Sequence, residues 1–164
     1  AREDWTPVLE GGASWQLETI QSAEPDGFGT FRWSYDDASY RPVAAAMEQL
    51  QAAGYEKFVC GGFSAGCDML LRAVTFSNAH CDALVLQSPW IPMLDEHADA
   101  AVSALQKKSI ALRILCGAED ADCLPLAEKL HALTKEAGLD VTLAVQEATR
   151  HQLPATPYQL GSLF

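Results

Sequence analysis

A serine flanked by two glycines lies near the middle of the chain, in the stretch FVCGGFSAGCDML at 58–70. Ser64 stands two positions from both Gly62 and Gly66, which gives the pattern G-x-S-x-G. Where this pattern joins a buried strand to a helix, the sharp turn holds the serine hydroxyl above the sheet as a nucleophile. We expect both glycines to be required, because a side chain at either position would strike the neighbouring strand or helix. The spacing therefore predicts a nucleophilic serine.

The residue after the serine supports chemistry at a carbonyl. Ala65 would begin the following helix, so its backbone N–H would point at an oxyanion formed beside Ser64, where the helix dipole favours negative charge. A glycine-rich turn can also hold a phosphate. The stretch lacks both G-x-G-x-x-G and the lysine of a phosphate-binding loop, so acyl chemistry is the better prediction.

A serine hydroxyl needs a general base, and four histidines could supply it. They are His80, His97, His131 and His151. His80 precedes a predicted strand, and His97 and His131 fall on predicted helices. Only His151 follows a strand, in the last loop of the chain. We therefore predict that His151 is the base, against the plain alternative of a surface histidine.

The base needs a carboxylate to orient it, and the segment GAEDADC at 117–123 offers three. This segment follows the predicted strand that lies between those of Ser64 and His151, and the order serine, acid, histidine is that of α/β-hydrolases. Asp120 is the predicted acid, and Asp122 remains the alternative. Glu119 is disfavoured because its side chain would have to turn back toward the sheet.

The elements that would position these residues alternate between strands and helices. Strands are predicted at 15–23, 57–62, 82–89, 110–117 and 140–147, and helices at 3–12, 40–54, 65–77, 97–108 and 123–138. Helices between strands indicate a mostly parallel sheet, which gives an α/β fold of three layers with helices on both faces. Ligands bind such sheets at the carboxyl ends of the strands, where the three predicted residues would meet.

Aromatic residues follow other strand ends in the same region. Trp33 lies in the long loop predicted at 24–37, Phe63 precedes the serine, and Trp90 belongs to SPWIPML at 88–94. They could bind an acyl or aromatic group, or serve loop packing alone. The connection from 89 to 97 is too short for a lid domain, which favours a small soluble substrate over a lipid interface.

Composition limits the partners and the compartment. The 164 residues suit one domain, and a net charge of −11 argues against binding of nucleic acid or anionic membranes. No apolar run reaches the roughly 20 residues of a membrane span. The five cysteines include no C-x-x-C pair, so we predict buried free thiols in the cytoplasm and no metal site.

The motifs GGFSAG, GAEDADC and ATRHQLP together resemble those of the small α/β-hydrolase esterases, a group that includes carboxylesterases, lysophospholipases and dienelactone hydrolases. The resemblance extends over nearly the whole chain. It implies a cofactor-free serine hydrolase that cleaves esters or thioesters of small soluble molecules through an acyl-enzyme. Ser64, Asp120 and His151 would be its catalytic residues, and Ala65 its oxyanion donor.

The sequence departs from this group at its start. Such enzymes begin with a strand that ends in a His-Gly type motif, whose loop supplies a second oxyanion N–H, and no such strand is visible here. Either the N-terminal strand is missing from this sequence or the oxyanion hole is built differently. We expect a single α/β-hydrolase domain over 1–164 that is incomplete at its N-terminus. An unpaired strand edge would favour a homodimer. The alternative to an enzyme is a catalytically silent binding or regulatory module on the same fold.

Overall fold

The computed structural model describes residues 9–10, 16–36, 38–55, 57–153 and 158–159. Its centre is a parallel sheet of four strands in the order β4-β5-β6-β7. These strands are β4 (Val59–Phe63), β5 (Ala83–Gln87), β6 (Ala111–Gly117) and β7 (Val141–Gln146). All three pairings are parallel, so the carboxyl ends of all four strands lie along one edge of the sheet.

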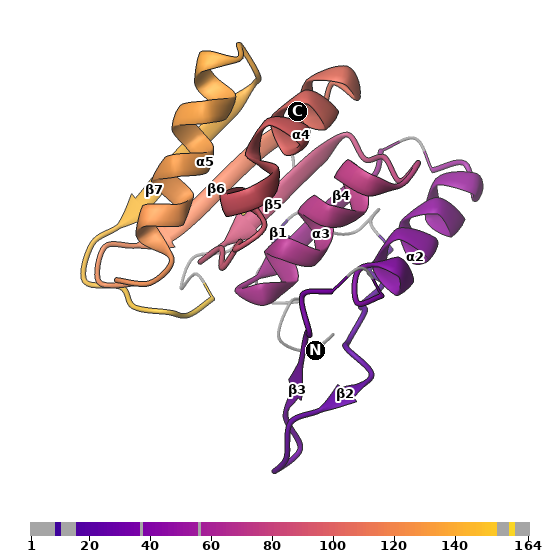
Figure 1. Ribbon diagram of the computed structural model, residues 1–164, viewed down its shortest axis with the longest axis horizontal. Coiled ribbons are helices and arrows are strands. Elements are labelled where there is room, and N and C mark those ends of the chain that lie inside the picture. The colour runs from indigo at the N-terminus through magenta and orange to yellow at the C-terminus, as the bar shows by residue number, and fades with distance from the viewer. Residues whose placement is uncertain (1–8, 11–15, 37, 56, 154–157, 160–164) are drawn as a thin grey trace.

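Four helices accompany the sheet, and Figure 1 shows them side by side on one of its faces. They are α2 (Arg41–Ala52), α3 (Ala65–Phe76), α4 (Leu94–Lys107) and α5 (Leu124–Glu136). Each crossover between neighbouring strands contains one helix, as parallel pairing requires. The α/β class and the parallel sheet are confirmed, but the described helices cover one face of the sheet and not both as predicted. The predicted helix at 3–12 lies largely outside the described residues.

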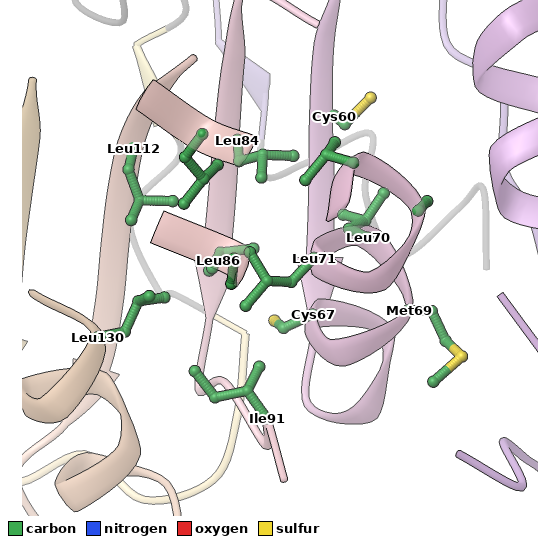
Figure 2. Close-up of a cluster of buried hydrophobic side chains, with 14 of the residues drawn as sticks. Cys60, Cys67, Met69, Leu70, Leu71, Leu84, Leu86, Ile91, Leu112 and Leu130 are labelled. Atoms are coloured by element: carbon green, nitrogen blue, oxygen red, sulfur yellow. The ribbon is translucent and has the colours of Figure 1, made fainter. Parts of the chain in front are cut away.

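The core between helices and sheet is built from alternate strand residues and from α3, which is buried on all sides over residues 67–74; Met69 and Leu71 point in opposite directions from this helix (Figure 2). Leu84 and Leu86 of β5 are fully buried, as are Leu71 of α3 and Leu112 of β6. Burying each such side chain contributes about 1.5–3 kcal/mol. β5 is buried along its whole length, since it lies between two other strands and under the helices. This packing holds the strand ends, and the loops that follow them, in place.

Three predictions near the N-terminus were wrong where the structure describes them. Residues 16–23 form no strand, and the loop predicted at 24–37 contains a short antiparallel hairpin of β2 (Glu24–Pro25) and β3 (Phe31–Arg32). Leu9 and Glu10, expected in a helix, form β1, which pairs in parallel with β8 (Tyr158–Gln159). The partner of β1 lies at the other end of the chain, so no local pattern indicates it.

Helix α4 begins three residues before its predicted start. Leu94 opens it, and His97 has non-helical angles (φ −129°, ψ 21°) that mark a kink at the position where we had placed the first turn. Asp95 and Glu96 lie in the first turn, where carboxylates are favoured by the helix dipole.

With 14 residues, α4 is the longest helix in the described ranges, and none of the helices there could cross a membrane.

Candidate active site

Ser64 occupies a sharp turn directly between β4 and α3. Its backbone angles are φ 53° and ψ −126°, a conformation that costs a non-glycine residue about 1–3 kcal/mol. Three backbone hydrogen bonds hold it there. The Ser64 N–H donates to the Gln87 carbonyl at 3.0 Å, and the Ser64 carbonyl accepts from the N–H groups of Cys67 at 3.0 Å and Trp90 at 3.3 Å. The turn is thus the strained strand-to-helix elbow that the sequence predicted.

The two glycines of the elbow are not equivalent. A Cβ on Gly62 would lie 2.9 Å from the Cys67 backbone nitrogen and 3.0 Å from the Gly66 carbonyl carbon, so the start of α3 can approach β4 only because Gly62 has no side chain. A Cβ on Gly66 would meet no atom within 4 Å. The expectation that both glycines are sterically required was therefore wrong for Gly66.

A pair of substitutions tests this difference. We expect Gly62→Ala to lower the free energy of unfolding by about 1–3 kcal/mol, because the new methyl group must push backbone away. Gly66→Ala should leave stability unchanged or raise it by about 0.5–1 kcal/mol, since alanine is the better helix residue. Urea denaturation of both variants measures this, and equal losses in the two would contradict the steric assignment.

Asp120 and His151 meet at the same edge of the sheet. His151 Nδ1 lies 2.9 Å from Asp120 Oδ2, and the Cys123 backbone N–H donates to the other carboxylate oxygen at 3.4 Å. Asp120 is only 4% exposed, whereas Asp122 is on the surface. Glu119 instead forms an exposed ion pair with Arg150. Of the three acidic residues in the segment, the structure therefore brings Asp120 to His151.

The surroundings of Asp120 keep it ionised. Burial alone would raise its pKa, but hydrogen bonds from His151, Ser88 and Cys123, together with the charge of His151, hold the pKa of Asp120 below its ordinary value of 3.8. A carboxylate accepts hydrogen bonds and cannot donate, so Nδ1 of His151 carries the proton between them. The remaining ring nitrogen, Nε2, is then free to accept a proton.

The imidazole lies beside the elbow. Its ring packs against Phe63, the residue before Ser64, with centroids 4.9 Å apart and planes tilted by 43°. No hydrogen bond joins the Ser64 hydroxyl to His151 among the residues described, and in enzymes without substrate this contact is often long. The His151 side chain is 43% exposed, so it has room to turn toward the serine.

Two residues that the sequence analysis missed hold the segment carrying His151. A Cβ on Gly117 would lie 2.1 Å from the Thr149 carbonyl oxygen, so the final loop passes directly over the end of β6. The Gln87 side chain, polar in the otherwise apolar strand ALVLQ, donates to the Gln152 carbonyl at 3.1 Å. In the sequence, a polar amide at the end of an otherwise apolar strand was the signal that could have identified Gln87.

An open pocket adjoins the elbow at Ala65. Its volume is about 590 Å³, and it is lined by Phe31, Arg32, Trp33, Ser34, Tyr35 and Ala65. Of the predicted aromatic residues, Trp33 lines this pocket and Phe63 contacts His151. Trp90 lies on the surface, and its backbone N–H donates a hydrogen bond to the Ser64 carbonyl. The pocket reaches the residue whose N–H was predicted to bind an oxyanion.

Comparison with known proteins rests on structure alone. No family model matches the chain, and no curated protein matches it. An uncharacterized protein from Bacillus cereus superposes with a TM-score of 0.83 at 22% identity, over 94% of this chain and 49% of that one. Zea mays acyl-protein thioesterase 2 gives 0.54 at 19% identity, over 72% and 59%. A Bacillus cereus carboxylesterase gives 0.51 at 16% identity, over 77% and 56%.

The chain has an α/β-hydrolase fold. It spans 49–59% of the length of these three structures, so it lacks part of what they contain. In the described part of the chain, Ser64 follows β4, the edge strand of the sheet, and Asp120 and His151 come after it in chain order.

Proposed function

We propose that this protein is a serine hydrolase that cleaves carboxylic ester or thioester bonds of small molecules through an acyl-enzyme intermediate. The observation that carries the proposal is the strained elbow of Ser64 with the buried Asp120 and its partner His151 beside it. Two similar structures, a thioesterase and a carboxylesterase, support the same chemistry.

The reaction would begin with proton transfer from the Ser64 hydroxyl to Nε2 of His151 as the serine oxygen attacks the substrate carbonyl. Asp120 would stabilise the imidazolium that forms and hold the ring in its Nδ1–H tautomer. His151 would then give the proton to the departing alcohol or thiol. Water, activated by the same nitrogen, would hydrolyse the acyl-enzyme and regenerate Ser64.

The oxyanion of the tetrahedral intermediate would be bound by the Ala65 N–H. As the first residue of α3, Ala65 has no partner for this group within the helix, and the helix dipole favours negative charge there. We assign Ala65 as one donor. A site with a single donor would be slower by about 10²–10³-fold than one with two.

The position of the pocket favours a small acyl group. Trp33 lines it, and Phe63 and Trp90 flank the serine turn.

The thiol of Cys123 is no competing nucleophile, because burial and the neighbouring Asp120 raise the pKa of Cys123 to about 12. Ser64 also stands where a dienelactone-type enzyme would have its cysteine, so the serine is the nucleophile we assign.

Covalent labelling tests the proposal. A fluorophosphonate probe should form a single adduct on Ser64, located by mass spectrometry after digestion, and the adduct should be absent from Ser64→Ala. Ser103→Ala, which changes an exposed serine of α4, is the matched control and should label normally. A folded protein that does not react would contradict the hydrolase assignment and favour the silent binding module.

A further inference from the structure

A cysteine thiol lies beside the acid–base pair, where the proposed mechanism has no use for it. Cys123 Sγ is 3.6 Å from His151 Nδ1, the same nitrogen that lies 2.9 Å from Asp120 Oδ2. The three potential ligand atoms all lie within 4.8 Å of one another. Cys123 and Asp120 are buried, and His151 is open to solvent, so the cluster is accessible from one side.

The spacing of these atoms suits a tetrahedral cation. Zinc binds sulfur at about 2.3 Å and nitrogen at about 2.0–2.1 Å, which places the two ligand atoms about 3.6 Å apart at a tetrahedral angle. Cys123 Sγ and His151 Nδ1 already have this separation. The nitrogen and the Asp120 oxygen would have to move from 2.9 Å to about 3.3 Å, and the sulfur and the Asp120 oxygen, up to 4.8 Å apart, would have to close to about 3.6 Å. Small rotations of the half-exposed imidazole and of the other two side chains would do this.

We propose that Cys123 Sγ, His151 Nδ1 and the Asp120 carboxylate form a binding site for Zn²⁺ that switches the active site off. Thiolate, imidazole and carboxylate are the ligands that zinc takes in proteins, and water would occupy the fourth position. The inhibitory half of this inference rests on the proposed hydrolase function, whereas the binding half does not.

Inhibition follows from which ring nitrogen the metal takes. Catalysis needs the proton of His151 on Nδ1 and a free lone pair on Nε2. Zinc on Nδ1 moves that proton to Nε2, which can then no longer accept the proton of Ser64. Asp120 is drawn to the metal and stops orienting the ring. The Cys123 thiol loses its proton to solvent, so each bound ion releases one proton.

Binding can be measured independently of activity with Co²⁺, a spectroscopic substitute for zinc. The purified full chain should give a thiolate-to-cobalt charge-transfer band that saturates at one ion per chain and disappears when Zn²⁺ is added. Cys123→Ser should lose the band. Cys81→Ala should keep it, because Cys81 is a buried thiol just before β5, at the opposite end of the strands from the cluster. A missing band, or one that persists in Cys123→Ser, would overturn the site.

The inhibitory role is tested by ester hydrolysis with and without Zn²⁺. Zinc should inhibit the wild type, a chelator should restore activity, and Cys123→Ser should need at least about tenfold more Zn²⁺ for half-inhibition, each protein being measured against its own metal-free rate. Stimulation by Zn²⁺, or equal inhibition of both proteins, would overturn the switch. A cobalt band without any metal-free esterase activity would support the site and overturn the hydrolase function instead.

Discussion

Ser64→Ala is expected to lower kcat for ester hydrolysis by about 10⁵–10⁶-fold, the usual loss when a serine nucleophile is removed. The hydroxyl makes no capping hydrogen bond with α3, and alanine imposes no new steric demand on the turn. Stability should therefore change little, and the loss can be assigned to chemistry. Steady-state kinetics with p-nitrophenyl esters of short acids measure the effect, with thermal unfolding as the check on folding.

Ser103→Ala again provides the comparison, because it removes the same hydroxyl from an exposed site on α4. It should retain full activity. If Ser64→Ala keeps more than about one-hundredth of the wild-type kcat, the hydrolysis does not proceed through an acyl-Ser64 intermediate and another nucleophile must be sought.

Asp120→Asn is expected to lower kcat by about 10⁴-fold. An amide in place of the carboxylate can donate a hydrogen bond to Nδ1, which stabilises the tautomer with its proton on Nε2 and removes the base. Asp122→Asn, two residues away on the surface, should be nearly neutral. These two variants decide between the acids that the sequence left open, and a large loss in Asp122→Asn alone would reverse the assignment.

The same substitution has a signature in stability. The pKa of Asp120 is lowered in the folded protein, so its ionised form stabilises the fold above the unfolded value of about 3.8, and this contribution is lost as pH falls through the lower folded value. The difference in unfolding free energy between wild type and Asp120→Asn should therefore narrow below about pH 3.8. Chemical denaturation between pH 7 and pH 3 measures it.

Local patterns in the sequence determined the main elements and the order of the site residues. Apolar runs with helices between them predicted β4 to β7 and α2 to α5. The rule that ligands bind at the carboxyl ends of parallel strands then selected His151 from four histidines, and the structure places it 2.9 Å from the predicted Asp120. These inferences succeed because strand period, helix period and strand-end position are local properties of the chain.

Contacts between distant segments were decided only by the tertiary structure. One example is the parallel pairing of Leu9–Glu10 with Tyr158–Gln159, and another is the approach of Thr149 to Gly117. Both depend on where remote backbone passes. The proximity of Cys123 to His151 is of the same kind, since the two residues stand 28 positions apart. A sequence records the burial and the turn preference of each residue, but not which remote atoms will face it once the helices pack on the sheet.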